Sequence, residues 1–339
     1  MRGERLCRES HAGKGRVRVQ DARERAENEM RYVIGIDAGG TKTHCAVADQ
    51  NGKILGEGFS GPAQHQVCGR EKTKQSLQDA IDQALKAAGL KKDDLACGVF
   101  GMSGADGEDD FLLLNGVVKE LMGEGDFEVM HDAWIGFRAA VDGKIGVVSI
   151  CGTGAGHAGE NRQGQRLTLR NLDYITGNVG GGGDLAERAM HYAFRSSEGT
   201  WDKSALEEEV PGLFGVETMD QVCAIVKSRD IPQEQRFQLP KLVFRLANQG
   251  DAVCKDMISW MGHEEGRYAA AVIRRLHMET EHVPMVLVGS LFGTRNPLLI
   301  DSYMEEARLA APGAYPVIPK VAPVMGAVKI ALEKLNPMI

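Results

Sequence analysis

The sequence predicts an α/β protein built of two similar domains, with a small-molecule site in the cleft between them. A chain of 339 residues usually contains about two domains. Two successive segments, beginning at Tyr32 and Lys144, each open with predicted strands around a glycine-rich turn and continue as alternating strands and helices. Repeated units of this kind predict two α/β domains, and small molecules usually bind between such domains.

In the first unit, short apolar runs predict strands, and apolar residues at helical spacing predict helices. Asn51-Gly52 lies between the second and third strands and predicts a two-residue hairpin turn. Gly89 predicts the end of the first helix. The predicted strands cover 32–37, 43–49, 53–59, 95–104 and 127–132. The predicted helices cover 71–88, 109–122 and 133–141.

The second unit repeats this order with a larger helical portion. One long helical section is predicted at 184–282, with a single break at 211–215. Further helices are predicted at 297–310 and from Pro323 to the end of the chain, because Pro favours the first helical position. The predicted strands cover 144–154, 157–161, 165–171 and 284–292.

Composition excludes several classes of protein. A net charge of -7 argues against a nucleic-acid partner. The seven cysteines are scattered and odd in number, without CxxC spacing, which is typical of reduced thiols in a cytoplasmic protein. No apolar run reaches the length of a membrane span and no signal peptide is recognisable. We therefore expect a cytoplasmic protein with neither a nucleic acid nor a membrane as partner.

Residues 1–29 differ from the rest of the chain. They contain eight basic and six acidic residues, few apolar ones and no periodic pattern, a composition typical of disorder. We interpret them as a disordered or non-native extension that precedes a native start at Met30. A short amphipathic helix from Asp21 is the alternative, and the intact mass of the natural protein distinguishes a start at Met1 from a start at Met30.

The most informative motif is Asp37-Ala-Gly-Gly-Thr-Lys42, which lies between two predicted strands. It is neither a Walker loop nor a Rossmann fingerprint, because both of those lead into a helix. Gly39 and Gly40 allow a close approach of the backbone to an anion, and successive N–H groups with the Thr41 hydroxyl can hold phosphate oxygens. We include Lys42 in this nucleotide site. Asp37 is placed to hold Mg²⁺ directly or through water; an ordinary hairpin turn is the alternative.

A second motif of the same kind opens the second unit. Gly152, Thr153 and Gly154 again lie between two predicted strands. Gly-Thr-Gly alone is weak support for a phosphate site. Two such turns at the start of two similar units predict loops that hold a triphosphate from both domains.

Asp132 is the predicted general base. It stands where a predicted strand passes into a helix, a common place for functional residues in α/β clefts. Phosphoryl transfer needs one carboxylate to receive the proton of the acceptor hydroxyl. The alternative role is a helix N-cap, which Asp also performs well. His131 beside it is interpreted as a packing neighbour.

Five motifs together carry a resemblance to a known family. DAGGTKT, GMSGAD, MHDA, ICGTGAG and VGSLF occur in this order. From about residue 32 to its end, the chain resembles the N-acetylglucosamine kinase-like branch of the acetate and sugar kinase, chaperone and actin superfamily, which is grouped with the BadF/BadG/BcrA/BcrD ATPases. The resemblance implies two RNase H-like domains of the actin/hexokinase type with an interdomain nucleotide cleft. It places the N-terminal domain at 30–142, completed by a C-terminal helix at 323–336, and the C-terminal domain at 143–322.

The resemblance also implies ATP and Mg²⁺ as cofactors and assigns residues to them. The motif from Asp37 to Thr41 corresponds to the first phosphate loop, and Gly152 to Gly154 correspond to the second. Asp132 corresponds to the catalytic base. Gly289 and Ser290 correspond to the adenosine turn.

A small-molecule sugar is the implied acceptor, bound by Gln64, Ser103, Gly104, Thr153 and Asn178. Two of these residues depart from the family pattern. Asn178 stands where the family has Asp, and Gln64 stands where it has Asn. Asn can donate and accept hydrogen bonds but carries no charge. These changes are compatible either with a retained hydroxyl contact or with a different acceptor.

We therefore predict an ATP-dependent carbohydrate kinase that acts on an amino sugar such as N-acetylglucosamine or glucosamine. One alternative is an ATPase that activates 2-hydroxyacyl-CoA dehydratases or drives benzoyl-CoA reduction, although Cys151, Cys223 and Cys254 lack the close spacing of cluster ligands. The other is a non-catalytic sugar sensor. We expect a homodimer; the small and apolar residues of 251–282 suit either a dimer face or core packing.

Overall fold

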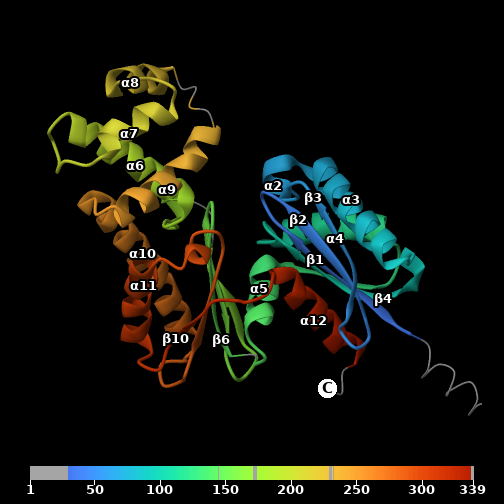
Figure 1. Ribbon diagram of the computed structural model, residues 1–339. Coiled ribbons are helices and arrows are strands. Elements are labelled where there is room, and N and C mark those ends of the chain that lie inside the picture. The colour runs from blue at the N-terminus through green and yellow to red at the C-terminus, as the bar shows by residue number, and fades with distance from the viewer. Residues whose placement is uncertain (1–29, 144, 171–173, 229–230, 232, 337–339) are drawn as a thin grey trace, which may run out of the picture.

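The computed structural model describes residues 30–143, 145–170, 174–228, 231 and 233–336. The predicted extension 1–29 lies outside the described residues, as do the first residue of the predicted strand 144–154 and the last of 165–171. The described residues form two five-stranded sheets with helices packed on them (Figure 1). The predicted α/β class with two repeated units is confirmed.

The first sheet has the strand order β3-β2-β1-β4-β5. Its strands are β1 (Tyr32–Ala38), β2 (Thr43–Asp49), β3 (Ile54–Ser60), β4 (Leu95–Met102) and β5 (Asp126–His131). The strands β1, β2 and β3 pair antiparallel, whereas β1, β4 and β5 run parallel. The carboxyl ends of these three parallel strands therefore meet at one edge of the sheet.

The second sheet repeats this topology, with the order β10-β9-β6-β7-β8. Its strands are β6 (Gly146–Cys151), β7 (Ala155–Glu160), β8 (Arg166–Thr168), β9 (Pro284–Val288) and β10 (Tyr315–Val317). Again three strands form an antiparallel meander, and β6, β9 and β10 run parallel. β10 was not predicted from the sequence, because it has only three residues and carries a proline.

Helices cover both sheets. Those associated with the first sheet are α2 (His65–Cys68), α3 (Arg70–Ala88), α4 (Glu108–Met122), α5 (Asp132–Ala140) and α12 (Pro323–Leu335). Those associated with the second are α6 (Gly182–Ser197), α7 (Leu206–Leu213), α8 (Met219–Lys227), α9 (Gln233–Asn248), α10 (Ala252–Arg275) and α11 (Pro297–Ala310). Short 3₁₀ turns cover Lys92–Asp94, Tyr174–Thr176 and Phe292–Thr294. No helix among the described residues is long and apolar enough to cross a membrane.

Apolar side chains at helical spacing explain how α3 packs. Leu77, Ile81 and Leu85 are buried along one side of the helix against the first sheet. Gly89 adopts the left-handed conformation, with φ of 69°, and its N–H donates to carbonyl groups of the last turn. Such an ending needs no side chain and favours glycine, so the predicted helix end is confirmed.

The predicted two-residue hairpin at Asn51-Gly52 is wrong in detail. The N–H of Asp49 donates to Lys53 O at 3.0 Å, which leaves three residues in the turn. Only Gly52 has a positive φ, of 82°, whereas a two-residue type I′ turn needs positive φ at both central positions. The Asp49 carboxylate accepts hydrogen bonds from the backbone N–H groups of Asn51 and Lys53, and these bonds stabilise the longer turn.

The single break predicted within 184–282 is also wrong, because five helices occupy the described residues of this section. Two of the unpredicted starts have N-caps that the helical pattern concealed. Thr218 Oγ1 accepts from the N–H of Gln221 at the start of α8. Asp251 accepts from the N–H of Cys254 at the start of α10, and its other oxygen accepts from Ala205. Side chains that bond to the first turn favour a new helix start there.

α10 buries its small and apolar residues within the chain. Gly262 and Gly266 lie so close to α11 that an added Cβ would be 2.6 Å from Leu299 O and 2.5 Å from Tyr303 O, respectively. The stretch 251–282 therefore serves core packing, one of the two interpretations of its composition. The homodimer stays a prediction.

Helices α5 and α12 lie between the two sheets and connect them (Figure 1). A Cβ added at Gly326 of α12 would lie 1.8 Å from Ile135 O of α5. A Cβ added at Gly35 of β1 would lie 2.6 Å from the backbone nitrogen of Val328. Glycine at these two positions allows the backbones to approach directly. The position of α5, which begins at Asp132, is therefore set by backbone contact with α12.

Candidate active site

The carboxyl ends of β1, β4 and β5 bring three of the predicted site regions together. Ala38, Met102 and His131 are in register across these neighbouring strands. The residues that follow belong to the predicted first phosphate loop (37–41), to the turn that begins with Ser103, and to α5, which begins with Asp132. The Ser103 N–H donates to Ala38 O at 2.9 Å, which holds the first two regions against each other.

The first phosphate loop is a tight turn with a side chain packed on it. The Gly39 N–H donates to Lys42 O at 2.9 Å, and Gly39 O accepts from Ala63 at 3.0 Å. A Cβ added at Gly40 would lie 2.8 Å from Gln64 Oε1. Gln64, one of the residues predicted to bind the sugar, therefore lies directly against the glycines of this loop.

The second phosphate loop (152–154) has the same design at the edge of the second sheet. The Gly152 N–H donates to Gly154 O at 3.0 Å, which closes the turn between β6 and β7. The predicted adenosine turn lies beside it, because the Leu291 N–H donates to Cys151 O at 3.1 Å. Gly289 has a φ of 100°, and an added Cβ would be 2.3 Å from Cys151 O. Only glycine fits this contact.

The glycine run before α6 packs on the second phosphate loop. The N–H groups of Gly182 and Gly183 donate to Gly152 O and Thr153 O, both at 2.8 Å. A Cβ added at Gly181 would be 2.6 Å from the Cα of Gly154. Asn178 lies buried in the segment that leads into this run. Asn178, predicted to bind the sugar, thus lies in the segment that leads into the glycines packed on the second phosphate loop.

A cavity of about 460 Å³ opens beside the second phosphate loop. Its size is that of a typical small-molecule site. Thr153 and Ser290, both predicted nucleotide residues, contribute to its wall. The remaining lining residues are Gly152, Gly182, Gly183, Ala186, Gln233, Arg236, Phe237, Pro240, Lys241, Phe244, Leu291 and Thr294.

The wall that α9 supplies was missed by the sequence analysis. Phe237, Pro240 and Phe244 give this wall an apolar surface, and Arg236 and Lys241 add positive charge. An apolar slot with cationic groups at a phosphate loop suits a nucleotide, whose base is flat and whose phosphates are anionic. In sequence these residues read only as part of a helix, and no local signal connects them to loops far away along the chain.

Asp37 and Asp132 place two carboxylates near the same edge of the first sheet. The pKa of Asp37 is raised from 3.8 to about 7, because burial disfavours its charged form and the nearby Asp132 carboxylate repels it; Lys42 acts in the opposite direction. A divalent cation at this position would offset both unfavourable effects. The donor chemistry of Asp37 therefore fits the predicted Mg²⁺.

His131 does more than the predicted packing. Its ring is buried, with Nε2 3.2 Å from Asp106 Oδ1 and Nδ1 3.0 Å from Asp132 Oδ1. Burial alone lowers the pKa of His131, but the bonds to Asp106 and Asp132 outweigh it and raise the pKa to about 10. Nδ1 also lies 3.0 Å from the Ala133 nitrogen at the start of α5. One nitrogen cannot accept from Ala133 and donate to Asp132 at once, and the two adjacent carboxylates favour the protonated ring.

Replacing Asp37 by Asn is expected to stabilise the ligand-free protein above pH 7. Since the folded pKa of about 7 exceeds the ordinary value of 3.8, folding favours the protonated carboxyl. The stabilising effect of the protonated Asp37 carboxyl is therefore complete below about pH 4 and is lost as the pH rises through about 7. The neutral amide avoids this loss, and we expect a gain of about 2–4 kcal/mol in the free energy of unfolding at pH 8.

Urea denaturation at pH 4, 6 and 8 measures this difference. The matched control is Asp79→Asn on the exposed surface of α3, for which no comparable gain at pH 8 is expected. Equal pH dependence of the Asp37→Asn variant and the natural protein would contradict the predicted burial effect.

Several known proteins are similar to this chain in sequence and in fold. The model of the BadF/BadG/BcrA/BcrD ATPase family matches residues 34–331. An N-acetylmuramic acid/N-acetylglucosamine kinase of Clostridium acetobutylicum is 26% identical over 307 residues, which are 91% of this chain and 100% of the relative. An N-acetyl-D-glucosamine kinase of Dictyostelium discoideum is 26% identical over 88% of this chain and 97% of its own length.

Among solved structures, a Chromobacterium violaceum protein provisionally named an N-acetylglucosamine kinase has the same fold. Its TM-score is 0.70 at 22% identity, over 89% of this chain and 99% of that protein. This likeness confirms the actin/hexokinase-type fold predicted from the motifs. The family match extends over most of the chain and includes both phosphate loops. The chain therefore belongs to the BadF/BadG/BcrA/BcrD ATPase family.

Proposed function

We propose that this protein is an ATP-dependent carbohydrate kinase that transfers the γ-phosphoryl group of MgATP to a hydroxyl of an amino sugar, such as N-acetylglucosamine or glucosamine. The observation that carries the proposal is the pair of glycine turns at equivalent strand ends of two similar sheets. One turn borders the cavity beside α9, and the other lies at the sheet edge that holds Asp37 and Asp132. A nucleotide held at the turn beside α9 and an acceptor held at the edge of the first sheet would bring the two reactants together.

The nucleotide occupies the cavity in this proposal. The adenosine lies between the turn at Gly289 and Ser290 and the apolar wall of α9. The phosphates extend along the second phosphate loop toward the first, where Gly39, Gly40 and Thr41 hold their oxygens with Lys42. Mg²⁺ would be held by Asp37 and would neutralise negative charge on the phosphates.

The acceptor is held at the edge of the first sheet. Gln64, Ser103 and Gly104 contact it from one side, and Thr153 and Asn178 from the other. Asp132 receives the proton of the attacking hydroxyl, since its side chain begins α5 next to the first phosphate loop and keeps an exposed fraction of 20%. The names of the relatives from Clostridium acetobutylicum and Dictyostelium discoideum support an amino sugar as acceptor.

Release of ADP from MgATP in the presence of different acceptors tests the proposal. The panel contains N-acetylglucosamine, glucosamine, N-acetylmannosamine, N-acetylmuramic acid, glucose and no acceptor. Turnover that depends on one amino sugar is the expected result. Hydrolysis without any acceptor would favour the dehydratase-activator type of ATPase. Tight sugar binding without turnover would favour a sensor.

A further inference from the structure

A chain of polar contacts extends from Asp132 through His131 to Asp106. His131 lies between two carboxylates, with Asp132 on one side at 3.0 Å and Asp106 on the other at 3.2 Å. The exposed fraction of the His131 side chain is 10%, against 20% for Asp132 and 26% for Asp106. The imidazole is therefore enclosed, and the Asp132 carboxylate is open to a bound acceptor.

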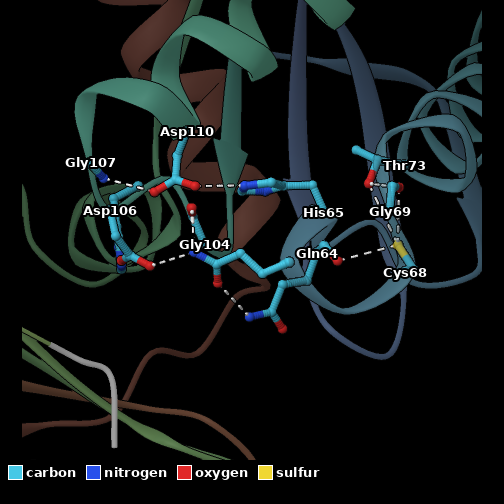
Figure 2. A network of polar contacts seen from close by, with 11 residues as sticks. Gln64, His65, Cys68, Gly69, Thr73, Gly104, Asp106, Gly107 and Asp110 are labelled. Atoms are coloured by element: carbon cyan, nitrogen blue, oxygen red, sulfur yellow. Dashed lines mark hydrogen bonds and ion pairs between the residues drawn. The ribbon is translucent and has the colours of Figure 1, made fainter.

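The same chain continues to residues 64–66, which we call the acceptor segment. The Gln66 amide group donates to Asp106 Oδ2 and to Gly104 O, both at 3.3 Å. Gln64 donates to Gln66 Oε1 at 3.4 Å. Figure 2 shows Gln64, Gly104 and Asp106 gathered in this network. The side chains of Gln66, Asp106 and His131 thus connect Gln64, which packs on the first phosphate loop, with the predicted base Asp132.

A second histidine–aspartate pair in the same region joins two helices. His65 Nε2 lies 2.7 Å from Asp110 Oδ1, and Asp110 Oδ2 accepts from the Gly107 N–H at 2.9 Å (Figure 2). This pair fastens α2 to the start of α4 and makes no contact with Asp132. Asp106–His131 and Asp110–His65 are therefore chemically alike, and only the first pair reaches the base.

We propose that Asp106 and His131 are positioning residues for Asp132, and that Gln66 connects them to the acceptor segment. The inference rests on the proposed kinase function. A carboxylate on the first residue of a helix can rotate about its side-chain bonds, and an enclosed imidazole at 3.0 Å holds one of its oxygens in place. The other oxygen is left to receive the acceptor proton. Because base catalysis requires hydrogen-bond geometry to the reacting hydroxyl, loosening this contact lowers the rate of the chemical step.

His131 also stands directly before α5, and the test must separate its contact with Asp132 from an effect on the start of the helix. In the His131→Asn variant the shorter side chain can cap α5 by accepting from the Ala133 N–H, because Asn is a good N-cap, but it cannot reach Asp106. Asp106→Ala removes the other half of the pair and leaves the residue before α5 unchanged. We expect each variant to lower kcat by about 10²-fold. KM for MgATP should stay close to that of the natural protein.

The double variant and a matched control complete the experiment. If the two residues act through one contact, the double variant is no slower than either single variant. Asp109→Ala, the control, removes an exposed carboxylate from the first turn of α4 and should leave kcat within about twofold of that of the natural protein. Unchanged kcat in the single variants, or losses that multiply in the double variant, would overturn the proposal. Asp106→Asn replaces Asp106→Ala if the latter does not fold.

A measurement without turnover separates this proposal from the proposed function. In a histidine ¹⁵N spectrum of the ligand-free protein, Asp106→Asn should shift the ring signals of His131 and leave those of His65 in place. An unmoved His131 signal would overturn the Asp106–His131 contact, whether or not the protein is a kinase. Absence of acceptor-dependent turnover in the natural protein, with the shift observed, would overturn the kinase proposal alone.

Discussion

Replacing Asp132 by Asn is expected to lower kcat for phosphoryl transfer by about 10³-fold, because the amide cannot take up the proton of the acceptor hydroxyl. Binding of MgATP should be retained, since the cavity beside α9 lies on the second sheet and does not include this residue. The fold should be retained as well, because Asn has nearly the same shape as Asp. Steady-state kinetics with the preferred acceptor and calorimetric titration with a non-hydrolysable ATP analogue measure the two effects.

Asp109→Asn is the matched control for this variant. Asp109 also lies in the first turn of a helix on the first sheet, but it is exposed and belongs to α4. Its replacement should leave kcat unchanged. Near-normal kcat in Asp132→Asn would remove Asp132 from the role of base, and lost nucleotide binding would indicate that it contributes to the nucleotide site instead.

Replacing Gly326 by Ala is expected to cause the largest loss of stability. The added Cβ would lie 1.8 Å from Ile135 O and 2.7 Å from Ala139 N. Both are backbone atoms of α5, so relief requires that α12 move away from α5 as a whole. We expect a loss of about 3 kcal/mol in the free energy of unfolding, at the upper end for an overpacked contact. Chemical denaturation measures this change.

The same substitution at Gly116 provides the control. Gly116 lies in the middle of α4, and an added Cβ would meet nothing within 4 Å. Ala favours a helix over Gly, so Gly116→Ala should stabilise the protein by about 0.5–1 kcal/mol. Similar changes in both variants would show that α5 and α12 are not held by direct backbone contact. Since α5 begins with Asp132, Gly326→Ala should also lower kcat.

Much of the candidate site could be predicted because its signals are local. A turn that must bring backbone N–H groups close to an anion needs glycine at particular positions, and the two glycine turns at residues 39–40 and 152–154 show this need directly in the sequence. Asp132 could be found for a related reason, since a carboxylate between a strand and a helix is a local pattern. The order of these segments along the chain then matched the order of the family motifs.

The failures of the sequence analysis have two physical causes. Periodicity measures the average character of a segment, so the five helices within 184–282 merged into one section with a single break. Caps such as Thr218 and Asp251 act through single side chains and leave the period almost unchanged. The turn at Asn51-Gly52 failed for a similar reason, because the neighbouring Asp49 side chain decided its length.

The sequence by itself determined the α/β class, the two repeated units and the glycine turns, because each depends on residues near one another in the chain. Tertiary structure alone decided which distant segments complete these turns. It placed α9 beside the second phosphate loop and the acceptor segment beside the first, and it enclosed His131 between Asp106 and Asp132. Such contacts depend on how helices and sheets pack, and a pattern in one segment holds no information about the segment that packs against it.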